Sequence, residues 1–227
     1  MVKREKTKGY IIYGNPENFK SLAIFTHGAS EDYSSEFMQF IIKELVGRQY
    51  LVMTFVFDFF RKKEGPSESL DHEIGEVEKA VQYASSNFNA EEIYLIGKSL
   101  GGVVNLAYQA KNNNRKIKTV AMLGLPIVLG FPLRMELLWE KDPKFPDYRF
   151  EYEKLLKGIK TKTLIIQGDK DDLYDREVAE SMFNDISYIK NANHGFKDAW
   201  SGARCYQECA DLLGRGLGAD GFSKIYD

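Results

Sequence analysis

A short apolar run followed by a glycine–serine–glycine spacing constrains this chain more than any other feature. Residues 93–96 form the run, and Gly97, Ser99 and Gly101 follow at alternate positions, directly before an apolar helical pattern. A serine at such a strand-to-helix turn is held in a strained conformation with its hydroxyl projecting. Glycines suit the flanking positions because the turn brings neighbouring backbone close together. The motif predicts Ser99 as a nucleophile, and the alternative is a glycine-rich turn with an incidental serine.

Size and composition indicate one soluble domain with a sizeable core. The chain has 227 residues, of which 44% are hydrophobic and 28% are charged, which fits a single α/β domain. A net charge of -2 provides no electrostatic reason to expect a nucleic acid partner. No apolar run approaches the length of a membrane span. We therefore expect neither a nucleic acid nor a membrane partner.

The N-terminal residues and the two cysteines indicate in which cellular compartment the protein is expected. Residues 1–8 are basic but precede no long apolar segment, so we expect a frayed, solvated terminus and not a signal peptide. Cys205 and Cys209 stand four apart in a predicted helix, a spacing that is awkward for a disulfide and short of ligands for a metal. Reduced cysteines predict a cytoplasmic protein.

Strand and helix patterns alternate along most of the chain, which predicts an α/β fold with a mostly parallel sheet and helices on both faces. The predicted strands are 10–13, 22–26, 51–57, 93–96, 118–123, 163–167 and 187–189. The predicted helices are 35–48, about 74–88, 100–111, 176–183 and 199–213. The tail from 214 to 227 is rich in glycine, and we expect it to be flexible.

Polar candidates for chemistry follow predicted strands, so they are expected at one edge of the sheet. His194 is predicted to be the base that takes the Ser99 proton, since an imidazole titrates near neutral pH. Asp171 is predicted to fix the His194 tautomer and to stabilise the imidazolium. Asp172 is the alternative for that acid.

Three further charged or polar residues near these positions are assigned structural roles. Asp175 is predicted to cap the next helix by accepting a backbone N–H. His27 is expected to shape its loop through hydrogen bonds. Lys98, directly before the serine, is expected to be a surface charge.

The chain resembles the serine α/β-hydrolases over residues 22–213. The matching motifs are His27-Gly28-Ala29, Gly97-Lys98-Ser99-Leu100-Gly101, Gly168-x-x-Asp171 and His194-Gly195, in the chain order Ser, Asp, His of that superfamily. Within the superfamily, the chain most resembles the dienelactone-hydrolase-like, small carboxylesterase and acyl-peptidase branches. Dienelactone hydrolases, however, use a cysteine as the nucleophile where this chain has Ser99. The resemblance implies an oxyanion hole formed by the backbone N–H groups of Leu100 and Ala29, with no cofactor and no metal.

The N-terminal part departs from the full pattern of this superfamily. Only about twenty residues precede the strand at 22–26. There is room for one clear early strand in place of an antiparallel pair. We therefore expect the N-terminal antiparallel edge of the sheet to be shortened.

The segment 126–160 interrupts the strand–helix alternation. It holds four of the six prolines and many aromatic residues, which predicts a small cap or flap between two late strands. Phe131 and Trp139, together with Phe59 from another loop, are predicted to line a pocket for the acyl group or for an aromatic alcohol. The alternative is that the flap aromatics only pack against the body of the domain.

These features together predict a serine hydrolase that cleaves small-molecule carboxylic esters through an acyl-enzyme. Two alternatives remain at this stage: a peptide or amide hydrolase resembling the acyl-peptidases, and a non-catalytic binding protein of hydrolase fold. The oligomeric state is open, with a homodimer as one outcome.

Overall fold

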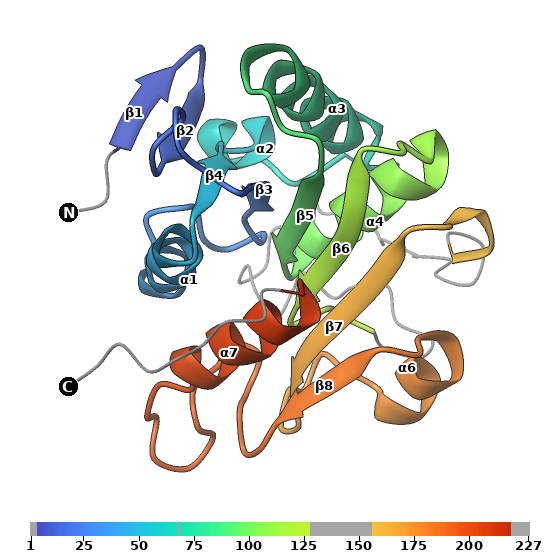
Figure 1. Ribbon diagram of the computed structural model, residues 1–227. Helices are drawn as coiled ribbons and strands as arrows, with labels where there is room; N and C mark the ends of the chain where they lie inside the picture. The colour runs from blue at the N-terminus through green and yellow to red at the C-terminus, as the bar shows by residue number, and fades with distance from the viewer. Residues whose placement is uncertain (1–3, 68, 128–155, 219–227) are drawn as a thin grey trace, which may run out of the picture.

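A mostly parallel sheet runs through the middle of the molecule (Figure 1). In the computed structural model, which describes residues 4–67, 69–127 and 156–218, eight strands form it. They are β1 (Arg4–Thr7), β2 (Tyr10–Tyr13), β3 (Ser21–Thr26), β4 (Tyr50–Thr54), β5 (Ile93–Lys98), β6 (Ile117–Leu123), β7 (Lys162–Gly168) and β8 (Ile186–Ile189). Their spatial order is β1-β2-β4-β3-β5-β6-β7-β8, and all pairs from β4 to β8 are parallel.

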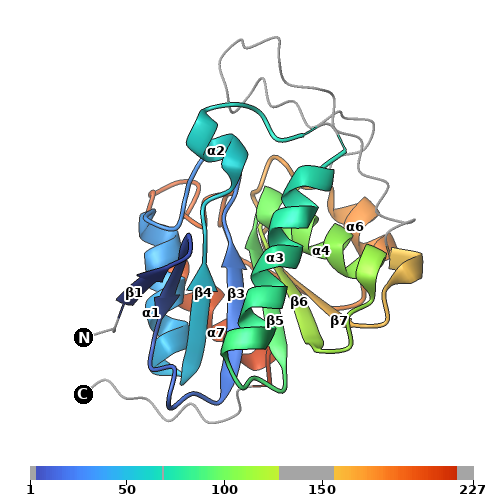
Figure 2. The same ribbon diagram turned by 90° about the horizontal axis from the view of Figure 1, so that it is seen from above.

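Helices cover both faces of the sheet. The described helices are α1 (Glu36–Gly47), α2 (Asp58–Lys62), α3 (Asp71–Asn87), α4 (Leu100–Asn112), α6 (Arg176–Met182) and α7 (Tyr206–Gly216). Residues of α1 and α7 pack into one apolar cluster with the sheet, and residues of α3, α4 and α6 pack into a second cluster on the opposite face. Figures 1 and 2 show α1 and α7 together on one side and α3 and α4 together on the other.

Burial on both faces explains why the central strands read as nearly continuous apolar runs. Every residue of β4 and β5 is buried, as are the last five residues of β3. The α/β fold predicted from the alternation is confirmed, with helices on both faces of the sheet.

The N-terminal edge differs from the prediction of a single early strand. Thr7 pairs with Tyr10 across a two-residue turn in which Lys8 and Gly9 have φ of 46° and 86°. Positive φ at both positions suits the right-handed twist of a hairpin, so β1 and β2 form an antiparallel pair. The expectations of one strand and of a frayed terminus were wrong for residues 4–7. Each strand has only four residues, so the edge is short but complete.

Two helices differ from the prediction. α2 was not predicted and lies between the predicted strand 51–57 and the predicted helix at about 74–88, and α7 begins at Tyr206 instead of near 199. Residues 192–204 fold back on themselves through isolated bridges between Lys197 and Arg204 and between Ala192 and Asp198. The Asp198 carboxylate accepts the N–H groups of Trp200 and Ser201, and the turn that they form ends at Gly202, whose φ is 71°.

The end of α7 lies within the predicted tail. The helix continues to Gly216, and Leu217 is buried, so the tail does not begin at 214. Residues 219–227 lie outside the described residues, as do 128–155 with Phe131 and Trp139. The flap therefore stays a prediction. Among the described helices, none is both long and apolar enough to cross a membrane.

Candidate active site

The turn between β5 and α4 holds Ser99 in a strained conformation. Its φ and ψ are 49° and -121°, a region that non-glycine residues rarely adopt. A Cβ at Gly97 would overlap the backbone of Gly101 and Gly102, and a Cβ at Gly101 would lie 2.5 Å from the His27 carbonyl oxygen. Both glycines of the motif are thus required by the close approach of backbone around the serine.

A continuous line of hydrogen bonds joins a serine, a histidine and an aspartate from three loops. His194 Nε2 lies 3.0 Å from Ser99 Oγ, and His194 Nδ1 lies 2.8 Å from Asp171 Oδ2. Because a carboxylate only accepts, Nδ1 donates to Asp171, which leaves the Nε2 lone pair facing the Ser99 hydroxyl. Asp172, the alternative acid, is exposed, and Asp171 is the residue that contacts the imidazole.

Asp171 is itself held by two donors. Its Oδ1 accepts the Leu173 N–H at 2.9 Å, and its Oδ2 also accepts a hydrogen bond from Gln167 Nε2. Gln167 is fully buried at the end of β7. Sequence reasoning missed this residue; a buried amide in an otherwise apolar strand was the available signal. A Cβ at Gly168 would overlap the Ala192 carbonyl, so this glycine lets the acid loop approach the histidine loop.

The loop after β3 lies against the serine. A Cβ on Gly28 would lie 3.3 Å from Ser99 Cβ. His27 is buried, its Nδ1 donates to the Gly28 carbonyl at 2.6 Å, and its Nε2 accepts the Phe57 N–H at 2.9 Å. In a trans peptide the C=O and N–H point in opposite directions. Anchoring the Gly28 carbonyl therefore fixes the direction of the Ala29 N–H.

His27 is structural, as expected, because both ring nitrogens are occupied within its own surroundings. Burial lowers the pKa of His27 below its ordinary value of 6.5. A neutral ring is what these two bonds require, since one nitrogen donates and the other accepts.

Buried hydrogen bonds of the Thr26 side chain join the end of β3 to the start of α4. Thr26 Oγ1 donates to the Gly101 carbonyl at 3.1 Å and accepts from Asn105 Nδ2 at 2.9 Å. Both side chains are fully buried. These two hydrogen bonds fix the position of the loop that holds Ala29 relative to the helix that begins at Leu100. In the part of the chain that the structure describes, neither the Ala29 N–H nor the Leu100 N–H donates to a backbone carbonyl.

Lys98 is buried, which corrects the expectation of a surface charge. It is 3% exposed, and its Nζ donates to the His194 carbonyl at 2.7 Å. Strand alternation places Lys98 on the same face as Ile96, and that face is covered by α1 and α7. Burial lowers the pKa of the Lys98 ammonium.

The environment of His194 favours the neutral form of the imidazole. Burial is the main cause that lowers its pKa from the ordinary 6.5, and the positive charge of Lys98 lowers it further. The hydrogen bond to Asp171 and the charges of Asp171 and Asp172 act in the opposite direction. A neutral imidazole can accept a proton from Ser99.

Phe59 does not have the place predicted for it. The side chain is 3% exposed, it stacks on Phe57 at 5.5 Å between ring centroids, and its centroid lies 6.0 Å from that of His27. Helix α2 turns this ring into the core beneath the His27 loop. Phe59 therefore supports that loop instead of lining a pocket.

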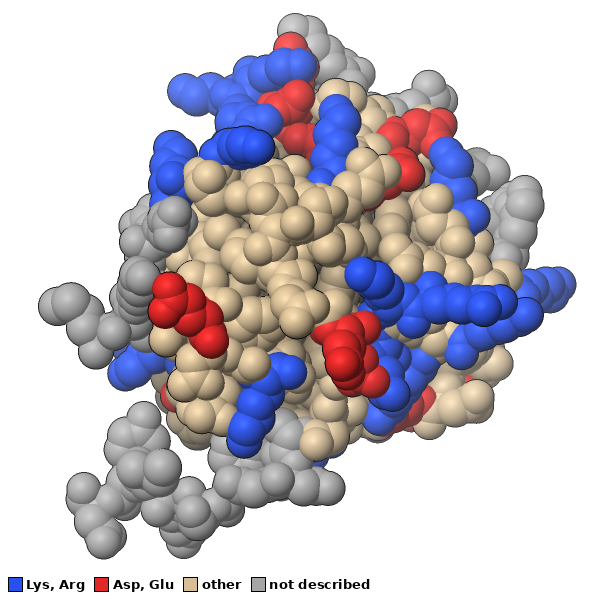
Figure 3. Space-filling view, turned by 45° about the horizontal axis from the view of Figure 1, so that its top comes forward, with Lys and Arg blue, Asp and Glu red and all other residues tan. Residues whose placement is uncertain are grey.

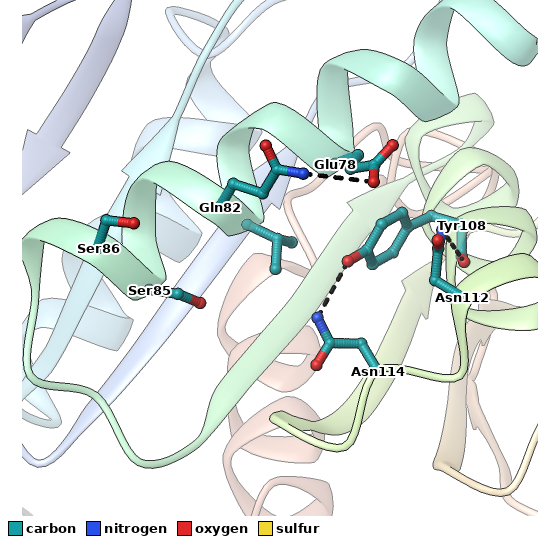
Figure 4. Close-up of a pocket in the computed structure, with 8 residues that line it drawn as sticks. Glu78, Gln82, Ser85, Ser86, Tyr108, Asn112 and Asn114 are labelled. Carbon is teal, nitrogen blue, oxygen red and sulfur yellow. Dashed lines mark hydrogen bonds between the residues drawn. The ribbon is translucent and has the colours of Figure 1, made fainter.

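A polar hollow of about 390 Å³ lies between α3 and α4 (Figure 4). It is lined by Glu78, Val81, Gln82, Ser85, Ser86, Tyr108, Asn112 and Asn114. Asn112 ends α4 and Asn114 precedes β6, so the hollow lies at the edge where the strands begin. Ser99 is at the opposite edge, where ligands of open parallel sheets bind.

One group of described side chains has the composition of a metal site. Ligand atoms of Asp58, His72 and Glu76 lie within 4.8 Å of one another. Arg61 forms ion pairs with both carboxylates, and His72 Nε2 lies 3.2 Å from Asp58 Oδ2. Arg61 already pairs with both carboxylates, so the group is an ion-pair network that joins α2 to α3.

Figure 3 shows Lys and Arg side chains gathered at the right and at the upper left of this face, with Asp and Glu side chains beside both groups and an area without charged side chains between them. Cys205 and Cys209 are both free in the structure, and burial raises the pKa of the Cys209 thiol.

Solved structures share the fold over nearly the whole chain. A serine hydrolase homologue from Coxiella burnetii matches with a TM-score of 0.63 and 14% identity, covering 96% of this chain and 97% of that one. XC6422 from Xanthomonas campestris, described as an α/β serine hydrolase without lid, matches with 0.63 and 15% over 99% and 96%. Est1E from Butyrivibrio proteoclasticus matches with 0.66 and 16% over 95% and 93%.

At these identities the structural likeness shows the fold. A comparison with curated proteins finds no match. Residues 19–212 match the family described as alpha/beta hydrolase domain. With that match and the open, mostly parallel eight-stranded sheet, the chain belongs to the alpha/beta hydrolase domain family.

Proposed function

We propose that this protein is a serine hydrolase that cleaves carboxylic esters of small molecules through an acyl-enzyme. The observation that carries the proposal is the line of hydrogen bonds from Ser99 Oγ through His194 to Asp171, with links of 3.0 Å and 2.8 Å. A nucleophile within hydrogen-bond reach of a base that is oriented by a third group is the arrangement of nucleophilic catalysis.

In the first half-reaction a bond forms between Ser99 Oγ and the acyl carbon while His194 Nε2 takes the hydroxyl proton. The imidazolium then gives that proton to the leaving alcohol as the ester bond breaks. In the second half-reaction His194 takes a proton from water while the water oxygen attacks the acyl carbon. The imidazolium then returns that proton to Ser99 Oγ as the bond between Oγ and the acyl carbon breaks and the carboxylic acid departs. Asp171 keeps the tautomer and stabilises the imidazolium in both steps.

Negative charge on the tetrahedral intermediate needs donors that are in place before the reaction. The N–H groups of Ala29 and Leu100 have that role in the proposal. The Ala29 peptide is oriented by the His27 bond to the Gly28 carbonyl, and the Leu100 N–H lies at the start of α4, where the helix dipole is positive. Removing one such donor in a comparable site costs roughly 10²–10³-fold in rate.

A carboxylic ester is favoured as substrate by the resemblance to small carboxylesterases and by one of the structural relatives. Est1E has been described with ferulic acid bound, which makes an aromatic acyl group a reasonable member of the test set. Peptide or amide hydrolysis, and binding without catalysis, are the outcomes that the experiment separates from this proposal.

The test is hydrolysis of p-nitrophenyl esters from acetate to octanoate and of one p-nitrophenyl ester with an aromatic acyl group, with the matching p-nitroanilides measured beside them. The wild type is expected to turn over esters faster than anilides, and Ser99→Ala is expected to lose about 10⁴–10⁶-fold in kcat. Ser86→Ala, on the exposed surface of α3, is the matched control and keeps the wild-type rate. Equal rates for wild type and Ser99→Ala would overturn the proposal, and faster anilide turnover would favour the amidase.

A further inference from the structure

We propose that Lys98 is a positioning residue of this site, whose buried ammonium holds the His194 loop from behind and places a positive charge beside the imidazole. The inference rests on the proposed function of Ser99, His194 and Asp171. It concerns a residue that the hydrolytic steps above do not use.

The surroundings of the Lys98 ammonium are built to hold it. Nζ donates to the His194 backbone carbonyl at 2.7 Å and lies 5.4 Å from the centre of the Phe196 ring, within cation–π range. A Cβ on Gly124 would lie 2.9 Å from Nζ and 3.6 Å from His194 Cε1. Gly124, at φ 62°, thus leaves room for the ammonium beside the imidazole.

Burial at this position is unfavourable unless the ammonium contributes something. A buried charge loses most of its hydration, and an apolar side chain of similar size at such a position often leaves stability unchanged or raises it. Methionine would fill the same volume beneath α1 and α7 without this penalty. The hydrogen bond to the backbone of the base is the specific contact that a methionine could not make.

The charges that face Lys98 come from three elements. Glu31 in the loop after β3 and Asp171 in the loop after β7 favour the ammonium, whereas burial disfavours it. The Cys209 thiol of α7 faces it as well, and its raised pKa keeps it neutral. Lys98 in turn lowers the pKa of His194, with burial as the larger cause and with Asp171 and Asp172 opposing.

Two effects can therefore be separated by substitution. Lys98→Met removes both the donor and the charge, and Lys98→Gln removes the charge but keeps an N–H donor. Lys170→Met is the matched control, because Lys170 precedes Asp171 but is exposed, where solvent screens its charge. Thermal unfolding is measured for each variant so that activity is compared only between folded proteins.

The experiment first establishes that the wild type hydrolyses p-nitrophenyl acetate and that Ser99→Ala does not, which tests the proposed function by itself. Lys98→Met is then expected to lose about tenfold or more in kcat, with KM changed much less, because the base is displaced from its reactive geometry. The acid limb of its pH profile for kcat/KM is expected to move to higher pH. Lys98→Gln is expected to recover part of kcat while keeping the moved acid limb.

An acid limb at the wild-type position in both Lys98 variants would overturn the inference even though the hydrolase activity stands, and so would an equal movement in Lys170→Met. If neither Lys98 variant folds, ¹⁵N NMR of the wild-type lysine side chain decides. A protonated Lys98 ammonium at pH 7 is the expected result, and a neutral amine would overturn the inference.

Discussion

His194 Nε2 and Ser99 Oγ lie 3.0 Å apart, although 95 residues separate them in the chain. The two residues meet because the strands that precede them are parallel. β5, β6, β7 and β8 lie side by side in this order and run in the same direction. The loops that follow these strands therefore open at the same edge of the sheet. Close approach of the Gly168 turn to the Ala192 carbonyl then brings Asp171 into reach of the imidazole.

Replacing Asp171 by asparagine tests the assignment of the acid. An amide has one oxygen and one NH2 group, so it cannot accept at both positions where Asp171 accepts, and His194 loses the partner that fixes its tautomer. We expect kcat to fall by about 10⁴-fold, as for the corresponding change in a serine protease triad. Asp172→Asn, an exposed neighbour, is the matched control and should retain activity within a few-fold. Steady-state kinetics of the two variants, measured under the same conditions, decides whether Asp171 or Asp172 is the acid.

The pH profile of kcat/KM should report the neutral form of His194. Its pKa lies below 6.5, chiefly because of burial and also because of Lys98. Since the base must be unprotonated, activity should rise with pH through this lowered pKa and stay level above it. The midpoint of the acid limb is expected below pH 6.5. A midpoint above that value would contradict the environment described for His194.

Adding a methyl group to Gly101 should disrupt the turn. The new Cβ would lie 2.5 Å from the His27 carbonyl oxygen and 2.7 Å from that of Thr26. Gly101→Ala is therefore expected to lose about 3 kcal/mol of stability or to fail to fold. Gly75→Ala, in α3 with no atom within 4 Å of the added Cβ, should gain about 0.5–1 kcal/mol. Urea unfolding measures both, and equal effects would show that the turn tolerates a side chain.

Glu76 should make stability depend on pH through the packing of α2 against α3. Burial is the main cause that raises its pKa from 4.5 to about 7, with His72 and Arg61 acting against it. Between these values the folded protein holds a proton that the unfolded chain has lost, so the contribution of Glu76 to stability falls as pH rises.

Glu76→Gln should therefore gain stability relative to wild type as pH increases from about 4.5 to 7, by up to about 3 kcal/mol. Chemical unfolding at several pH values measures the difference. The exposed Glu91→Gln serves as the control for loss of one carboxylate. A difference between wild type and Glu76→Gln that is constant across this range would contradict the prediction.

Much of the fold could be predicted because burial on both faces leaves a strong mark in sequence. The apolar runs of β3, β4 and β5 identify central strands of a parallel sheet. The positions of Ser99, Asp171 and His194 after strands then place them at one edge. β1 could not be found this way, because Arg4–Thr7 is polar and is paired only through its hairpin.

Other features depend on tertiary contacts that local pattern does not encode. From the sequence, Lys98 was predicted to lie at the surface. It is buried because α1 and α7 cover that face of the sheet, and there it donates to the His194 carbonyl. The final helix starts at Tyr206 because the residues before it turn at Gly202, with φ of 71°, and pair through the Lys197–Arg204 bridge. Phe59 was predicted to lie in a loop and to line a pocket, whereas helix α2 directs its side chain into the core.

The most direct test of the central claim is labelling by a fluorophosphonate at pH 7, followed by mass spectrometry of the intact protein and of its peptides. The wild type should acquire one adduct on Ser99, Ser99→Ala should acquire none, and His194→Ala should react far more slowly because the hydroxyl has lost its base. Folded wild-type protein that remains unlabelled at Ser99 would contradict the account and leave a hydrolase-fold binding protein as the better description.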